Sequence, residues 1–365
     1  MDILKQIREQ KQNPKQKKLY AGMEGKILMF YGSNNLGKTF QACSFDPNKT
    51  LVLATENGVN AISLGIDPVL IEDAGEFRRI VLQLVDRKNR KELLESITYV
   101  VIDSVDRITA LFETYVIKKY NSDNFSKPDF VPITHISDIP YGGGYSEVNR
   151  TVSELMNSLT MAGYCVIFID HDETNEKYKD KNTGEEYSYT FPRNTSSKSG
   201  SIFRDLPDWV FYLTAGGFDE RGIEKPSSAY CIRRKHVFAR SRYPESAPFI
   251  EVFSAENVKK LVKDAVEKRA EKIGAVVVDS FYDTIEIKTT EQIKAEKEAE
   301  RKETVEKITT YSKTLYKNFP EDTLKIITSH LGEGKVDEVP VERLSDLKKT
   351  LDDLMFFANE KGVEV

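Results

Sequence analysis

The sequence is poor in cysteine and histidine, the side chains that build disulfide frameworks and zinc sites. Its 365 residues include three cysteines, far apart along the chain, and four histidines whose spacing matches no metal-ligand pattern. Two of the cysteines fall in apolar, strand-like segments, so we expect buried free thiols in a reducing compartment. The pattern argues against a disulfide scaffold and against a zinc site built from these residues.

Long hydrophobic runs and an excess of positive charge are also missing. No apolar segment approaches the roughly 20 residues that a membrane-spanning helix needs, and the first residues lack the apolar core of a signal peptide. The formal net charge of -5 gives no general attraction to nucleic acid, so any contact with DNA must come from local patches. We therefore expect a cytosolic, globular protein that has no membrane partner.

One stretch, residues 26–39, combines a strand pattern with a glycine motif. Five apolar residues at 27–31 have the length of a buried strand. They lead into G-x-x-x-x-G-K-T, made of Gly32, Ser33, Asn34, Asn35, Leu36, Gly37, Lys38 and Thr39. Glycines at such a bend let several backbone N–H groups point at an anion beside a helix N-terminus. The sequence therefore predicts a P-loop that binds a nucleoside triphosphate.

Individual roles follow from the chemistry of this motif. Lys38 supplies a positive charge to the β and γ phosphates, and the Thr39 hydroxyl binds Mg²⁺. Phe40, which begins the helix after the motif, is included among the nucleotide-binding positions. A second magnesium ligand is expected at Asp103, where an apolar strand ends in an acid, with part of the contact through water. The alternative for Asp103 is an N-cap of the following helix.

Hydrolysis also needs a group that orients the attacking water. Glu56 is the leading candidate because it follows the strand at 50–54, which we expect to lie beside the P-loop strand. Asp103 and Asp106 compete for that role, and Glu56 has the alternative of being a surface acid. His171 ends the strand expected next to that of Asp103, where it either senses the γ-phosphate or is structural. The predicted catalytic residues are thus Glu56, Lys38 and His171.

Three polar regions are candidates for contacts with DNA. The segment 231–242 carries five cations and no acid. It is either a basic, solvated hairpin, a source of guanidinium groups that reach the γ-phosphate of a neighbouring subunit, or a contact for DNA phosphates. The loops 121–146 and 174–200 interleave aromatic and basic residues, a pattern suited to single-stranded DNA. Tyr141 and Tyr145 are the candidates in the first loop, and Arg193 and Lys198 in the second, which is diluted by acids. Solvated disorder is the alternative for both loops.

The order of patterns predicts the architecture. Continuous apolar strands alternate with helical segments up to residue 170, which favours an α/β fold whose largely parallel sheet is covered on both faces. Residues 172–200 show no clear period, and the strands near 209–213, 228–234 and 249–252 look like antiparallel additions to the sheet edge. We expect four regions: 1–20, a basic N-terminal arm; 21–256, the core; 257–306, a charged helical linker; and 307–365, a helical module.

With these residues in place, the chain resembles the phage-encoded ATP-binding proteins of the RecA-like recombinase superfamily. These are small ATPases linked to single-strand annealing and homologous recombination. The resemblance covers about residues 21–255. It rests on G-x-x-x-x-G-K-T at Gly32–Thr39, A-T-E-N-G at Ala54–Gly58, V-V-I-D-S at Val100–Ser104, Y-G-G-G-Y at Tyr141–Tyr145, F-I-D-H at Phe168–His171, R-D-L-P-D-W-V-F-Y at Arg204–Tyr212 and A-R-S-R-Y-P at Ala239–Pro244.

The resemblance implies a RecA-like P-loop core and a small C-terminal helical module. It makes Glu56 the catalytic glutamate, gives 121–146 and 174–200 the positions of two DNA-binding loops, and lets Arg240 and Arg242 act across a subunit interface. The implied cofactors are ATP and Mg²⁺. The implied partners are single-stranded DNA, further copies of the chain in a ring or filament, and a phage single-strand-binding or replication protein at the C-terminal module, all in the host cytosol. A ring helicase or translocase and a nucleotide-gated interaction module with little turnover are the alternatives.

Overall fold

The computed structural model describes residues 17–55, 64–86, 93, 95–180, 183–193, 197–284, 290–332 and 334–363, without the side chains of 290–296. The chain divides into two compact units, residues 1–285 and 286–365, and each is treated by itself. Among the described residues, no helix is long and apolar enough to cross a membrane.

A central sheet organises the first unit. Its nine strands in the described part of the chain run in the order β12-β10-β9-β2-β6-β5-β3-β4, with β11 paired to β9. Their bounds are β2 Ile27–Tyr31, β3 Thr50–Ala54, β4 Val69–Leu70, β5 Tyr99–Asp103, β6 Cys165–Asp170, β9 Trp209–Thr214, β10 Ser228–Tyr230, β11 Arg240–Ser241 and β12 Phe249–Ile250. The six strands from β9 to β4 are parallel. The predicted α/β class with a mostly parallel sheet is therefore confirmed.

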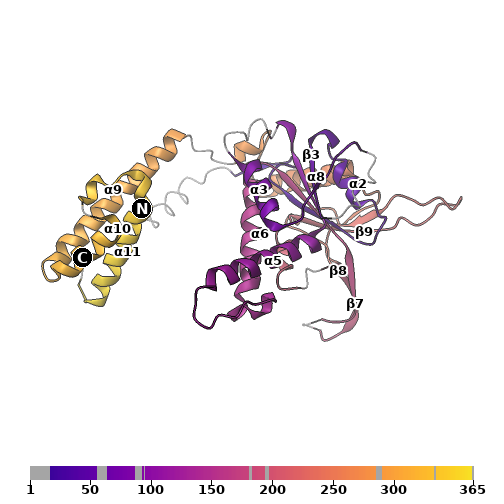
Figure 1. The fold of residues 1–365 in the computed structure, drawn as a ribbon. Helices are drawn as coiled ribbons and strands as arrows, with labels where there is room; N and C mark the ends of the chain where they lie inside the picture. The colour runs from indigo at the N-terminus through magenta and orange to yellow at the C-terminus, as the bar shows by residue number, and fades with distance from the viewer. Residues whose placement is uncertain are drawn as a thin grey trace. The chain divides into compact units, whose positions relative to one another are not determined.

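Helices cover both faces of this sheet (Figure 1). The face that carries Leu28 and Phe30 packs against α2 Lys38–Cys43 and α8 Ala255–Ile273. The opposite face, with Met29, packs against three helices and a short fourth. These are α3 Ala74–Val85, α5 Val105–Asn124, α6 Gly143–Ala162 and α7 Ser201–Asp205. Because side chains alternate along a strand, a run such as 27–31 is buried on both sides and must be apolar throughout.

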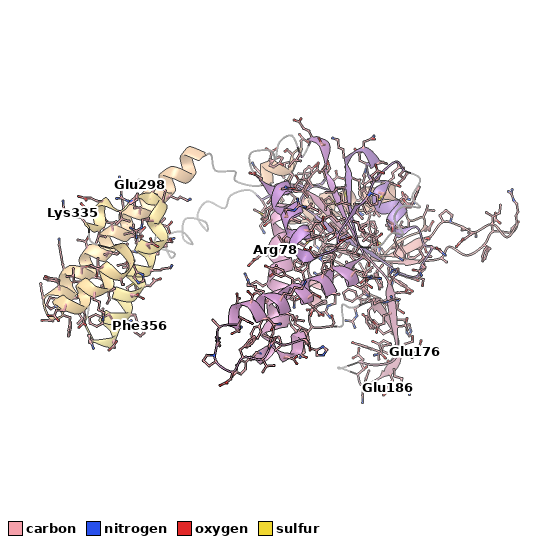
Figure 2. The ribbon with its side chains drawn as sticks, in the orientation of Figure 1. Arg78, Glu176, Glu186, Glu298, Lys335 and Phe356 are labelled. Atoms are coloured by element: carbon pink, nitrogen blue, oxygen red, sulfur yellow. The ribbon has the colours of Figure 1, made fainter. Side chains whose placement is uncertain are left out.

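The segment after β6 is more regular than the sequence indicated. Asp172–Lys179 (β7) and Glu186–Pro192 (β8) form an antiparallel hairpin, whereas no period was expected there. Contacts between aromatic rings hold it together, with the tilted rings of Tyr178 and Tyr189 4.7 Å apart between centroids. Glu176 and Glu186 lie on the part of the hairpin away from the sheet (Figure 2). The apolar contacts are thus made within the hairpin, so its strands lack the apolar runs of the central sheet.

The last strands and the region boundaries also differ from expectation. β9 is parallel to β2 rather than antiparallel. Among the described strands of this sheet, the antiparallel pairs are β10 with β9, β11 with β9, and β12 with β10. The expected linker at 257–306 begins inside α8, whose apolar side is buried in the core. Val276–Val278 (β13) pairs with Lys18–Tyr20 (β1), which belongs to the expected basic arm. α8 is an amphipathic helix: most of its charged residues are exposed, and its apolar side packs in the core of the first unit.

The second unit is a small helical module. Its helices are α9 Thr290–Tyr316, α10 Pro320–Leu331 and α11 Leu344–Glu360, and they enclose a core that includes Ile308, Leu315 and Leu354. Short 3-10 turns complete both units: η1 Pro47–Lys49, η3 Ile136–Asp138, η4 Pro140–Gly142, η5 Phe281–Thr284, η6 Val336–Glu338 and η7 Val341–Arg343.

Candidate active site

The glycine motif forms a tight bend between β2 and α2. Asn35 and Gly37 adopt positive φ angles of 64° and 74°, a backbone conformation that favours glycine and tolerates asparagine. Gly32 lies so close to β9 that an added Cβ would come within 2.7 Å of the Leu213 carbonyl oxygen. A side chain at position 32 would therefore push the loop away from the sheet. The backbone geometry fits the predicted anion-binding loop.

Lys38 is enclosed by this bend. Its side chain is buried, and Nζ donates hydrogen bonds to the carbonyl oxygens of Gly32 at 2.8 Å and Ser33 at 2.7 Å. Burial lowers the pKa of Lys38, while the carboxylates of Asp172, Asp103 and Asp170 oppose that shift. The ammonium is thus pre-positioned inside the loop, where a phosphate would supply the anion that its surroundings only partly provide.

Thr39 and Asp103 meet as the sequence suggests. The Thr39 hydroxyl donates a 2.7 Å hydrogen bond to Asp103 Oδ2, which joins the first turn of α2 to the end of β5. A hydroxyl and a carboxylate are hard oxygen ligands that suit Mg²⁺. The part of the chain that the structure describes holds no group of three or more acidic, histidine or cysteine side chains able to bind a metal alone. The pair therefore fits an ion that also takes ligands from phosphates and water.

Asp170 is a site residue that was not predicted from the sequence. This residue ends β6, the strand between β2 and β5, and its side chain has no solvent exposure. Oδ1 accepts a 2.9 Å hydrogen bond from the His171 backbone, but the buried Oδ2 has no hydrogen-bond partner among the described residues. Burial raises the pKa of this carboxyl well above its usual value. An acid ending a wholly apolar strand, the pattern that identified Asp103, was the available signal.

The base of the β7–β8 hairpin adjoins the P-loop. The Ser33 hydroxyl donates a 2.9 Å hydrogen bond to Asp172 Oδ2, at the start of β7. Asp172 pairs with Pro192, and the Arg193 backbone N–H donates to the His171 carbonyl oxygen at 2.7 Å. Burial is the main cause of the lowered pKa of Lys38 and of the raised pKa of Asp170; the charge of Arg193 adds to the first shift and opposes the second. Arg193, which was predicted to contact DNA, therefore lies at the edge of the candidate nucleotide site.

The two remaining predicted catalytic residues have different outcomes. Glu56 lies outside the described residues, and its role stays a prediction. The expectation that its strand lies beside the P-loop strand is wrong, because β6 and β5 separate β3 from β2. β3 instead pairs with β5, so it ends beside the strand of Asp103. His171 follows β6, which pairs with β5 as expected, and its backbone is held by Asp170 and Arg193.

Arg240 and Arg242 lie far from the P-loop of their own subunit. β11 pairs with the start of β9, which itself pairs with the start of β2, at the edge opposite the glycine motif. Arg242 binds Asp208 at 3.2 Å and the Leu206 carbonyl oxygen at 2.8 Å. Arg240 donates to the Arg204 carbonyl oxygen at 3.3 Å. Neither residue completes the site within one chain, and an action across a subunit interface stays a prediction.

The structure brings together two of the predicted DNA contacts. Lys198 Nζ lies 5.3 Å from the centroid of the Tyr145 ring, although the residues come from different loops. Tyr141 is fully exposed, so its ring is free to stack on a base. On the nucleotide side, Phe40 is nearly half exposed on the first turn of α2. The contacts of these residues with DNA and with the nucleotide stay predictions.

The site combines a buried lysine in a glycine bend with a threonine that is hydrogen-bonded to the aspartate at the end of β5. This combination defines a P-loop nucleoside triphosphatase fold. A family model described as "AAA domain" matches residues 24–243, which is more than half of the chain. The chain belongs to this AAA domain family of P-loop ATPases.

Two similar proteins add context. The SPbeta prophage-derived uncharacterized protein YorG of Bacillus subtilis (strain 168) is 29% identical over 345 residues, covering 94% of this chain and 96% of its own. Among solved structures, that of the RadB recombinase matches with 14% sequence identity and a TM-score of 0.31, covering 59% of this chain and 83% of its own.

Proposed function

We propose that this protein binds and hydrolyses ATP with Mg²⁺ and acts on single-stranded DNA in phage recombination or replication. The observation that supports the ATPase most strongly is the Thr39–Asp103 hydrogen bond next to the enclosed Lys38. These groups lie on the same side of the sheet, as a triphosphate held between a glycine bend and an acid requires. Membership of the AAA domain family supports the same conclusion.

The roles of the residues follow from their positions. The backbone N–H groups of 33–39 and the Lys38 ammonium bind the phosphates, and Thr39 and Asp103 hold the metal, partly through water. When bound, Mg²⁺ neutralises charge on the phosphates. We assign orientation of the attacking water to Glu56, whose strand β3 ends beside Asp103, and sensing of the γ-phosphate to His171.

The DNA part of the proposal rests on the surface near α6. An exposed Tyr141 ring and the Tyr145–Lys198 pair combine stacking with positive charge, the chemistry that binds single strands. The prophage origin stated in the name of YorG supports a phage setting. Arg240 and Arg242 lie at the edge opposite the P-loop, an arrangement that suits head-to-tail assembly into a ring or filament. The helical second unit is the proposed contact for a phage replication partner.

The test measures ATP binding and turnover, each with and without single-stranded DNA. For Lys38→Ala we expect loss of ATP binding, whereas the control Lys49→Ala, at an exposed position in η1, keeps wild-type affinity. Glu56→Gln should bind ATP and lose turnover, and DNA should raise the wild-type rate. DNA affinity should fall steeply with salt because phosphate contacts release counterions. Absence of ATP binding by the wild type would refute the proposal, and full turnover in Glu56→Gln would exclude Glu56 from catalysis.

A further inference from the structure

The β7–β8 hairpin touches the P-loop at its base. Its first residue, Asp172, accepts the 2.9 Å hydrogen bond from Ser33, the second residue of the glycine motif. The strands are in register there, because Asp172 pairs with Pro192. Arg193 follows directly, and its backbone is fixed by the 2.7 Å hydrogen bond to the His171 carbonyl oxygen. The position of Arg193 is therefore set by β6 and β8 and does not depend on the far end of the hairpin.

Two cations, Lys38 and Arg193, lie at this edge together with the carboxylates of Asp103, Asp170 and Asp172. The Arg193 side chain is exposed and makes no hydrogen bond or ion pair with any residue that the structure describes. Lys38 donates its hydrogen bonds to neutral carbonyl oxygens rather than to a carboxylate. A phosphate bound between Lys38 and Arg193 would give both cations an anionic acceptor, which neither side chain has among the described residues. The anion for which the glycine bend is shaped is a phosphate.

We propose that Arg193 binds the γ-phosphate of a nucleoside triphosphate within its own subunit, and that Asp172 accepts the hydrogen bond of Ser33 only until that phosphate binds. The inference rests on the proposed nucleotide binding. It replaces the expected DNA contact of Arg193, which we now assign to the nucleotide.

The geometry favours the γ-phosphate over the other two. The glycine bend and Lys38 surround the phosphates from the side of β2, whereas Arg193 approaches from the corner between β6 and β7. β6 lies between the P-loop strand and the strand of Asp103, so a terminal phosphate directed toward Asp103 passes this corner. A guanidinium offers planar, paired N–H groups that match phosphate oxygens. Lysine at position 193 would keep the charge and lose the paired donors.

Asp172, in contrast to Arg193, opposes the binding of a triphosphate. Its carboxylate accepts the Ser33 hydroxyl and lies near Lys38, as the oxygen of a phosphate would. A triphosphate must therefore displace this contact and overcome the repulsion of a negative charge. Removing the charge from Asp172 should strengthen triphosphate binding, which is an unusual result for a substitution in a binding site.

The experiment uses the full chain with Mg²⁺ and no DNA. Equilibrium affinities are measured for ADP and for a non-hydrolysable ATP analogue that carries a γ-phosphate. For Arg193→Gln we expect about tenfold weaker binding of the analogue, the size of one charge-assisted contact, with ADP binding within about twofold of wild type. Arg193→Lys should be intermediate. Asp172→Asn should bind the analogue about threefold more tightly or better, with a smaller change for ADP.

The matched control is Lys177→Gln, which removes one positive charge from an exposed position farther along β7 and should change neither affinity. Melting temperatures of all variants show that they are folded. Equal affinity of wild type and Arg193→Gln for the analogue would overturn the inference, as would equal losses for ADP and the analogue. If the wild type binds neither ligand, or if Lys38→Ala binds both normally, the proposed function fails instead.

Discussion

At the scale of single residues, the Thr39–Asp103 contact is where metal binding can be tested most directly. Thr39→Val keeps the shape of the side chain and removes the hydroxyl that donates to Asp103. We expect the increase in ATP affinity on adding Mg²⁺ to fall by about tenfold, because a hydrogen bond or ligand to a charged group contributes about 1.5–3 kcal/mol. Affinity without Mg²⁺ should change little. Nucleotide titrations with Mg²⁺ and with a chelator make the comparison.

The control for this substitution is Thr114→Val in α5. Thr114 is exposed, and its hydroxyl donates only to the Ala110 carbonyl oxygen one turn earlier. The same atoms are removed on the helix surface, so the dependence of affinity on Mg²⁺ should match that of the wild type. An equal loss in the two variants, or a normal Mg²⁺ dependence in Thr39→Val, would contradict the assignment of Thr39 as a metal ligand.

Asp170 leads to a prediction about pH and stability. Burial raises the pKa of its carboxyl in the folded state above the unfolded value of about 3.9. Between these two values the folded protein keeps a proton that the unfolded chain releases, so its stability falls as pH rises. The limiting slope for one group is about 1.4 kcal/mol per pH unit. Asp170→Asn cannot ionise, so it should gain stability relative to the wild type as pH rises from about 4.

Urea unfolding of both proteins across this pH range measures that difference. Asp123→Asn, at an exposed position in α5, controls for the loss of one carboxylate from the surface. Stability curves of wild type and Asp170→Asn that stay parallel throughout would show that the buried carboxyl ionises as it does in the unfolded chain. The unpartnered oxygen of Asp170 would then require another explanation.

At the scale of elements, local patterns predicted the site better than its surroundings. The bend at 32–39 was recognisable because its chemistry requires glycines, a lysine and a threonine at fixed spacing. Asp103 was recognisable because it ends an apolar strand. The order of the strands cannot be read from local sequence patterns. The expectation that β3 lies beside β2 was therefore wrong, because β6, which is distant in sequence, pairs with β2. The burial of Asp170 depends on this order, whereas its position as an acid that ends an apolar strand was a local signal like that of Asp103.

The hairpin and α8 show why other elements escaped prediction. In β8, Tyr187, Tyr189 and Phe191 alternate with polar residues, which is a strand signal, but β7 has no such alternation. The rings of Tyr187 and Tyr189 both contact Tyr178 on the facing strand, so only the pairing of the two strands reveals the hairpin. In α8, charged residues outnumber apolar ones, and the buried stripe becomes clear only against the sheet. Both errors arise because packing, rather than local propensity, decides the structure.

At the scale of the whole molecule, α8 determines where the chain can be cut. Its buried residues lie in the same core cluster as Phe30 of the P-loop strand and include Val258, Leu261, Val262 and Val266. A chain that ends at residue 285 retains the whole first unit, so we expect it to fold and to bind nucleotide within about twofold of the full chain. A chain that ends at residue 256, the boundary expected from sequence, exposes the face that α8 covers and should not fold cooperatively.

Circular dichroism melts and nucleotide titrations of the two shortened chains compare these boundaries. A pair of point variants in the full chain keeps the argument independent of truncation. Val262→Ala removes two buried methyl groups and should lower the free energy of unfolding by about 1–3 kcal/mol, whereas Val276→Ala, on the exposed part of β13, should change it far less. A stable, nucleotide-binding chain ending at 256, together with a negligible cost for Val262→Ala, would place α8 outside the ATPase unit. The predicted linker boundary would then be correct after all.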